Sequence, residues 1–306
     1  MKDKISIIGA GNVGTTAAHC CLRMDLGKIV LLDVNADIPR GKALDLSQAA
    51  VLEGHAGDIT GTADYRDTAG SDLVIVTAGI ARKAGMSRDD LLKINAGIVT
   101  QVMQKALQAS PQALFIVTSN PVNVMCRLAL KTMTDHRRLI GLSGVLDGAR
   151  MRAQIALTTG VPVNEVQGFV LGDHGDTMVP LPRLAVIGGV PATALLSAGQ
   201  LAEVSKKTIS GGADIINLTG CSSFYAPGIA LAVMAHALLN DSRTILPCST
   251  YLQGQYGEHD VYMCVPVRLG RKGVEEIIEV VLEDGEKAAL ARTAAHIRAN
   301  FEVVAG

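Results

Sequence analysis

The sequence feature that most constrains the fold is a glycine-rich turn between a short apolar segment and a helical one. Residues 5–8 form a β-rich run, residues 9–14 read GAGNVG, and a helical stretch then reaches residue 24. A strand, a GxGxxG turn and a helix in this order are typical of a dinucleotide-binding site. The pattern therefore predicts that the chain begins with a nucleotide-binding βαβ unit.

Each glycine of this turn has a separate physical reason. Gly9 permits a sharp turn, a side chain at Gly11 would block the backbone from a pyrophosphate, and Gly14 lets the helix pack closely on the strand. The free N–H groups at the start of the helix then face the phosphates. The residues predicted to bind the cofactor here are Gly9, Ala10, Gly11, Asn12, Val13 and Gly14.

An acidic residue at the end of the next strand indicates which dinucleotide binds. Residues 28–33 read KIVLLD, so Asp33 follows the turn by about 20 residues, the spacing at which a carboxylate accepts hydrogen bonds from the adenosine ribose. The same carboxylate would repel a 2′-phosphate, which favours NAD over NADP. The alternative is a solvated aspartate at a strand end without a ligand.

The remaining apolar runs predict a two-part α/β architecture. Residues 72–77 and 113–118 contain continuous apolar runs of the kind found in buried parallel strands, and residues 91–109 between them read as a helix. Strands alternating with helices predict a doubly wound parallel-sheet (Rossmann) domain over residues 1–145. The rest of the chain, residues 146–306, mixes helices and strands and is predicted to form an α+β substrate domain. Its expected helices are 201–218, 227–239 and 284–300, and its expected strands are 244–252 and 261–269.

Composition excludes several classes of partner. The 306 residues carry 28 Lys and Arg against 29 Asp and Glu, a formal net charge of −1, which argues against nucleic acid or an anionic membrane as partner. No apolar run is long enough to span a bilayer, and no pair of histidines has metal-ligand spacing. We therefore expect a cytoplasmic protein without a metal site.

Loops that leave the carboxyl ends of parallel strands carry ligand-binding residues in such folds. The loop 78–90 contains Arg82, Lys83 and Arg88, which suits a lid over an anionic substrate; the alternative is a solvated basic loop. After the next strand, Asn120 precedes a proline, which would hold its amide toward the cleft. The alternative is an ordinary Asn-Pro turn at a helix start.

The second half supplies a candidate acid/base group. In GVLDGAR, Asp147 and Arg150 would lie on one face of a helix, where an ion pair without a catalytic role is the alternative. In GDHGD, His174 sits in a glycine-rich turn at the end of an apolar strand. An imidazole titrates near neutral pH, so it suits the proton transfer that accompanies hydride transfer to a ketone.

In their order along nearly the whole chain, these motifs resemble the lactate/malate dehydrogenase family, and within it the lactate-dehydrogenase-like malate dehydrogenases. The resemblance implies NAD as cofactor and hydride transfer on a 2-hydroxy acid. It further implies that His174 is the general acid/base and that Asp147 orients it. The substrate contacts that it implies are Arg82, Arg88, Asn120 and Arg150, and the further cofactor contacts are Asn95, Thr118, Ser119 and Asn120.

Arg82 selects the substrate in this comparison, because malate enzymes carry arginine there and lactate enzymes usually glutamine. Oxaloacetate has a second carboxylate where pyruvate has a methyl group, and burying that carboxylate unpaired would be costly. The expected substrates are malate and oxaloacetate; lactate or another 2-hydroxy acid is the nearest alternative, and a non-catalytic NAD-binding redox sensor another. Family loops often have proline where this chain has Ala84. The resemblance also implies a homodimer or homotetramer, and Ser222 and Ser223 in the region that lines the substrate pocket.

Overall fold

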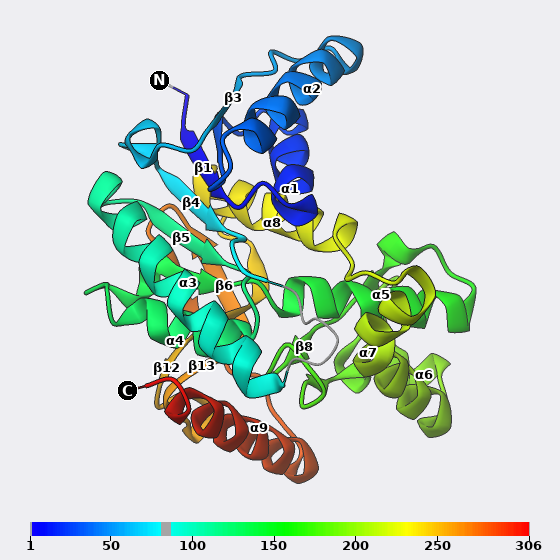
Figure 1. The fold of residues 1–306 in the computed structure, drawn as a ribbon. Helices are drawn as coiled ribbons and strands as arrows, with labels where there is room; N and C mark the ends of the chain where they lie inside the picture. Colours follow the sequence, from blue (N-terminus) through cyan, green and yellow to red (C-terminus); the bar gives the residue numbers. More distant parts are fainter. Residues whose placement is uncertain (1, 81–86, 306) are drawn as a thin grey trace.

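A nine-stranded sheet forms the centre of the molecule (Figure 1). The structure is a computed structural model and describes residues 2–80 and 87–305. Six of the strands are parallel, in the order β6-β5-β4-β1-β2-β3. These strands are β1 (Lys4–Ile8), β2 (Lys28–Leu32), β3 (Ile59–Thr62), β4 (Leu73–Val76), β5 (Leu114–Val117) and β6 (Leu139–Gly141).

Helices cover both faces of this sheet, so the predicted Rossmann fold is confirmed. On one face α1 packs against α8, and on the other α3 packs against α4 (Figure 1). The four helices of the first half are α1 (Asn12–Arg23), α2 (Asp37–Glu53), α3 (Arg88–Ala109) and α4 (Val122–Leu130). The helix expected over 91–109 begins earlier because Ser87 caps it: Ser87 Oγ accepts from Asp90 N at 3.0 Å, and the Asp90 carboxylate accepts from Ser87 N at 3.2 Å.

The second half mixes helices and strands, as expected, and it also contains five short strands that were not predicted. Its helices are α5 (Gly144–Thr159), α6 (Ala192–Leu195), α7 (Ala198–Thr219), α8 (Tyr225–Leu239) and α9 (Asp284–Glu302). Its short strands are β7 (Val166–Gln167), β8 (Val170–Leu171), β9 (Val179–Pro180), β10 (Val186–Ile187) and β11 (Val190–Pro191). Its long strands are β12 (Ile245–Gln253), β13 (His259–Gly270) and β14 (Gly273–Ile277).

The three long strands do not form a separate sheet. They run antiparallel to one another and extend the parallel sheet beyond β6, where Ser249 of β12 pairs with Gly141. A Cβ on Gly141 would lie 2.7 Å from the Ser249 Cβ, so this close pairing requires glycine. The sheet therefore crosses the expected division at residue 145, and the edge of β6 is covered by the second half of the chain.

The main apolar core, like the sheet, is built from both halves of the chain. The main core combines first-half residues such as Ile7 and Phe115 with Leu231 of α8, Val265 of β13 and Ile297 of α9. A smaller core lies among α5, α6, α7 and the short strands, and its buried residues include Met151, Val166, Met178, Ile187 and Val204. Over the described ranges, none of the helices combines the length and the apolar character needed to cross a membrane.

Candidate active site

The glycine-rich turn has the tight geometry that its sequence predicts. Gly9 has φ +113°, and its carbonyl accepts a hydrogen bond from Thr77 Oγ1 at 2.9 Å. A Cβ on Gly14 would lie 2.0 Å from Gly9 O, so only glycine lets α1 begin this close to β1. A Cβ on Gly11, by contrast, would meet no atom within 4 Å. The space beside Gly11 is open at the N-terminus of α1, which fits a bound phosphate.

Asp33 lies beside this turn at the carboxyl end of β2. Its Oδ2 accepts from Ala10 N at 2.7 Å and its Oδ1 from Val34 N at 2.8 Å. These two bonds fix the orientation of the carboxylate and tie it to the turn. The turn predicted to bind the pyrophosphate and the acid predicted to bind the adenosine ribose are therefore adjacent.

A cavity of about 690 Å³ opens at the carboxyl ends of the strands. It lies between the first-half loops and the helices α5 and α7, so both halves of the chain supply its walls. Predicted site residues that line it are Val13, Asn95, Thr118, Ser119, Asn120, Arg150 and His174. Ser222 and Ser223, expected near the substrate, line it as well.

Asp147 contacts two ionisable side chains that line this cavity, Arg150 and His174. Its Oδ2 lies 2.7 Å from His174 Nδ1 and its Oδ1 lies 3.0 Å from Arg150 Nη1. The Asp147 side chain is 1% exposed, whereas those of Arg150 and His174 are each 17% exposed. A carboxylate only accepts hydrogen bonds, so Nδ1 carries a proton and Nε2 is the ring nitrogen left for a substrate. The i, i+3 ion pair and the imidazole contact are both present.

The surroundings of His174 set its protonation. Burial lowers the pKa of the imidazole, but the charge of Asp147 and its hydrogen bond raise it more, and the net pKa lies above the ordinary value for histidine. The Asp147 carboxylate thus stabilises the imidazolium. A histidine in this state can donate a proton to a developing alkoxide and take it back in the reverse direction.

The loop that carries His174 is anchored by a buried polar chain. Asn123 of α4 donates to Asp173 Oδ1 at 2.7 Å, and its own Oδ1 accepts from Ser249 Oγ of β12. The backbone of Gly172 exchanges two hydrogen bonds with Cys264 of β13, at 2.9 and 2.8 Å. Asn123 and Ser249 were not predicted, and the only sequence signal for Asn123 is its place in the segment TSNPVN.

The guanidinium of Arg150 lies against two glycines in the middle of α7. A Cβ on Gly212 would lie 3.5 Å from Arg150 Nη1 and Nη2, and one on Gly211 would lie 3.3 Å from Arg150 Cδ. Glycine is unfavourable inside a helix by about 1 kcal/mol relative to alanine. The two glycines therefore leave space for the guanidinium but lower the stability of the helix. The Gly-Gly pair in the sequence could have indicated this contact, but it was not used in the prediction.

Asn95 was expected to contact the cofactor, and its side chain is buried. Its Oδ1 accepts from Ile80 N at 2.9 Å, while its Nδ2 donates to Ile80 O at 3.3 Å and to Asn120 O at 2.8 Å. It therefore holds together the two loops that follow β4 and β5. Ser119 Oγ, which donates to Ala78 O, links the same loops. Asn120 is exposed at the cavity and precedes a cis peptide bond to Pro121, which the sequence did not reveal.

Two predicted arginines remain predictions, because the structure does not describe their side chains. Arg82 and Ala84 lie outside the described residues. Arg88 is the first residue of α3, and nothing further is described for its side chain. Over residues 2–80 and 87–305, no cluster of three or more His, Cys, Asp or Glu side chains has the geometry to hold a metal ion.

Comparison with known proteins identifies the family. Residues 3–141 match the NAD binding domain of lactate/malate dehydrogenases, and residues 144–305 match their alpha/beta C-terminal domain. The malate dehydrogenase of Desulforudis audaxviator is 50% identical over 300 residues, 97% of each chain. Among solved structures, the malate dehydrogenase of Salinibacter ruber is similar with a TM-score of 0.94 and 42% identity, covering 98% of this chain and 97% of that one.

A lactate dehydrogenase of Cryptosporidium parvum, solved with lactic acid and NAD, is also similar. Its TM-score is 0.96 and its identity 34%, covering 100% of this chain and 99% of that one. The chain therefore belongs to the lactate/malate dehydrogenase family of NAD-dependent oxidoreductases, and the predicted family and cofactor are confirmed. The fold alone does not choose between the two substrates, because proteins of both names match it closely.

Proposed function

We propose that this chain is an NAD-dependent malate dehydrogenase that interconverts malate and oxaloacetate. The observation that carries the chemistry is the Asp147 carboxylate shared by His174 and Arg150, which both line one cavity. The relatives named malate dehydrogenase, 44–50% identical over nearly the whole chain, support malate as the substrate.

The residues present fit the cofactor. The open space beside Gly11, the adjacent Asp33 carboxylate and the cavity next to them would hold the pyrophosphate, the adenosine ribose and the nicotinamide end respectively. When bound, NAD supplies the hydride acceptor. We assign the remaining cofactor contacts to Ala10, Asn12, Val13, Asn95, Thr118, Ser119 and Asn120.

The protein side of the reaction then follows from charge and geometry. Arg150 binds the carboxylate next to the reacting carbon through two parallel hydrogen bonds. His174 Nε2 removes the hydroxyl proton during malate oxidation and returns it during oxaloacetate reduction, while Asp147 stabilises the imidazolium. Asn120 and Arg88 hold the substrate oxygen. Arg82 pairs with the second carboxylate, which would be costly to bury alone.

The test is NADH oxidation with oxaloacetate and with pyruvate, for the wild type, Arg82→Gln and the neighbouring control Lys83→Gln. We expect strong preference for oxaloacetate and a loss of about 10²-fold in kcat/KM for oxaloacetate in Arg82→Gln alone, because one carboxylate is left unpaired. Equal or better turnover of pyruvate by the wild type would instead assign a lactate-type dehydrogenase. Binding of NADH without turnover of either acid would indicate a redox sensor.

The same assay tests the choice of dinucleotide. Asp33→Ser should lower kcat/KM for NADH and raise it for NADPH, because the carboxylate that repels a 2′-phosphate is removed. A wild type that uses NADPH as well as NADH would contradict the role given to Asp33.

The remaining assignments are parts of this proposal. They are a cytoplasmic location, a step of the tricarboxylic acid cycle, a homodimer or homotetramer, and a division into a cofactor domain (1–145) and a substrate domain (146–306). An oligomer is supported by exposed apolar side chains on α8, among them Tyr225, Ile229 and Val233. Sedimentation of the purified protein would distinguish a monomer from either oligomer.

A further inference from the structure

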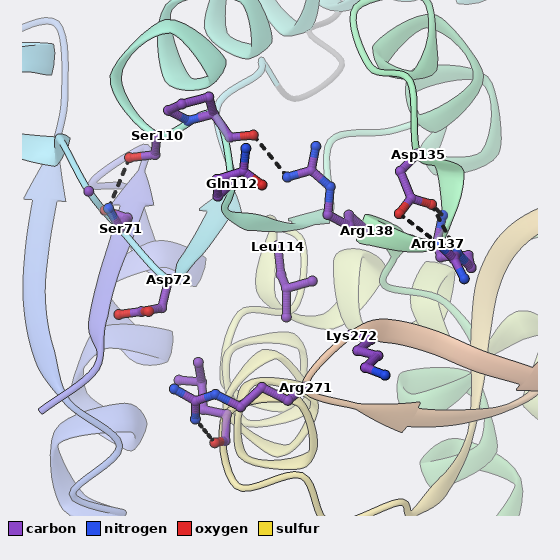
Figure 2. Close-up of a pocket in the computed structure, with 13 residues that line it drawn as sticks. Ser71, Asp72, Ser110, Gln112, Leu114, Asp135, Arg137, Arg138, Arg271 and Lys272 are labelled. Atoms are coloured by element: carbon purple, nitrogen blue, oxygen red, sulfur yellow. Dashed lines mark hydrogen bonds and ion pairs between the residues drawn. The ribbon is translucent and has the colours of Figure 1, made fainter.

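A second cavity lies at the amino ends of the parallel strands, whereas the candidate active site lies at their carboxyl ends. It has a volume of about 510 Å³ and lies where β4, β5 and β6 begin. Figure 2 shows Leu114 between Arg138 on one side and Arg271 and Lys272 on the other. Nothing in the proposed reaction uses this cavity.

Two basic dipeptides from distant parts of the chain form its rim. Arg137 and Arg138 end a short 3-10 helix before β6, and Arg271 and Lys272 form the turn between β13 and β14. Gly273 makes this juxtaposition possible. It has φ +93°, and a Cβ there would lie 2.1 Å from Arg137 O, so only glycine lets the turn approach this closely.

Two of the four cations are neutralised by carboxylates. Arg137 Nε lies 3.1 Å from Asp135 Oδ1, and Arg271 forms an ion pair with Asp3. These pairs hold their side chains in place, as the dashed lines of Figure 2 show for Arg137.

The other two cations have no carboxylate partner in the described ranges. Arg138 Nη1 donates to two neutral carbonyls, Pro111 O at 2.9 Å and Ala113 O at 3.3 Å. These two bonds fix the position of the guanidinium. Its Nε and Nη2 groups make no hydrogen bond to any described residue. Lys272 is exposed and makes neither a hydrogen bond nor an ion pair with any described residue. Gathering like charges is unfavourable unless an anion compensates them.

The rest of the wall combines apolar and polar side chains. Gln112 lines the cavity, and so does Asp72, whose carboxylate accepts a hydrogen bond from Lys4 N at 2.8 Å. Leu114 and Leu239 are buried and form apolar parts of the wall. Ser110 Oγ accepts from Ser71 N at 3.0 Å and donates to Thr68 O at 2.7 Å, so its hydroxyl is already used. An apolar wall lowers the local dielectric and strengthens the attraction between a fixed cation and an anion.

We propose that this cavity is a second ligand site that binds a small polyanion bearing phosphate groups. The guanidinium of Arg138 presents paired N–H groups that match two phosphate oxygens, and Lys272 supplies a compact positive charge across the cavity. The size of the cavity suits a metabolite and not a nucleic acid strand. The bound anion would connect the amino ends of the parallel strands to the β13–β14 turn.

The test measures binding of inorganic pyrophosphate by calorimetry, with NADH at saturation so that the dinucleotide site is occupied. We expect Lys272→Gln and Arg138→Gln each to weaken binding by about tenfold or more, since each removes a charged hydrogen-bonding partner. The matched controls are Lys206→Gln and Arg292→Gln, exposed cations of α7 and α9 that remove the same charges elsewhere. These should bind as the wild type does.

Thermal unfolding gives a second readout, because a ligand that binds the folded chain alone raises its Tm. Pyrophosphate should raise the Tm of the wild type and of the controls. It should not raise the Tm of the double variant that carries both Arg138→Gln and Lys272→Gln. If Arg138→Gln fails to fold, Lys272→Gln decides alone, since Lys272 has no hydrogen bond or ion pair to lose among the described residues. Equal binding by wild type and variants, no binding at millimolar pyrophosphate, or binding of citrate but not pyrophosphate would each overturn the proposal.

Discussion

His174 Nδ1 lies 2.7 Å from Asp147 Oδ2, although the two residues come from a loop and a helix that are separated along the chain. The same carboxylate is 3.0 Å from Arg150 Nη1. One buried aspartate thus orients both the imidazole that we propose as proton carrier and the guanidinium that we propose binds the substrate. Changes at this aspartate should therefore affect pH dependence as well as rate.

Asp147→Asn should lower the pKa of His174, because the charge that raises it is removed. Oxaloacetate reduction needs the imidazolium, so its rate falls as pH rises through this pKa, and in the variant that fall should occur at lower pH. Malate oxidation needs the neutral imidazole, so its rate rises as pH rises through this pKa, and in the variant that rise should also occur at lower pH. We expect kcat to drop about 10²–10⁴-fold. A pH profile of unchanged midpoint would exclude the role of Asp147 in setting the pKa.

Arg150→Lys tests whether planar recognition of a carboxylate matters. Lysine keeps the charge but cannot form two parallel hydrogen bonds, so kcat/KM for oxaloacetate should fall by about tenfold or more. Arg152→Lys on the same helix is a matched control, because Arg152 Nε donates to a backbone oxygen, Val166 O, at 2.7 Å. Steady-state kinetics give kcat/KM for both variants. Equal losses of kcat/KM would show that the effect is not specific to Arg150.

A pair of alanine substitutions separates ligand binding from folding in the glycine-rich turn. Gly11→Ala meets no neighbour within 4 Å, so the Tm should hardly change while the KM for NADH rises. Gly14→Ala places a Cβ 2.0 Å from Gly9 O and should reduce the free energy of unfolding by about 1–3 kcal/mol. Calorimetry and NADH titration of both variants provide the comparison. A Gly11→Ala protein that binds NADH normally would contradict the proposed phosphate site.

Asn95→Leu tests whether this buried side chain is a structural link or a cofactor contact. Leucine has a similar size but leaves Ile80 N and Asn120 O without their partners, each at a cost of about 1–3 kcal/mol. We expect a lower Tm together with a higher KM for NADH. A variant with an unchanged Tm and weakened NADH binding would show that Asn95 serves the cofactor alone.

Local sequence patterns predicted most of the helices and strands, because apolar runs and helix caps act over a few neighbouring residues. Residues 73–76 and 114–117 are apolar throughout, and they form the strands β4 (Leu73–Val76) and β5 (Leu114–Val117). The helix expected over 201–218 extends to Ala198–Thr219, since a capping box of Ser197 and Gln200 adds a turn. The residue periodicity indicates such elements but not their exact ends.

What the sequence did not reveal are contacts made across the chain. The pairing of Ser249 with Gly141, which joins β12 to the parallel sheet, depends on two residues whose neighbourhood only the fold determines. The use of Asn95 to connect two loops is of the same kind. The approach of Asp147 to His174 was expected only because the motifs resemble a known family.

The continuation of the sheet from β6 into β12 has a consequence for engineering. A cofactor half excised at residue 145 would expose the edge of β6 and lose α8, which packs on α1. Halves exchanged between relatives would have to match along this seam, where glycine faces serine. We expect chimaeras joined at residue 145 to fold only when the donor of β12 also keeps a small residue opposite Gly141, so recombination between family members is limited by a backbone contact far from any ligand.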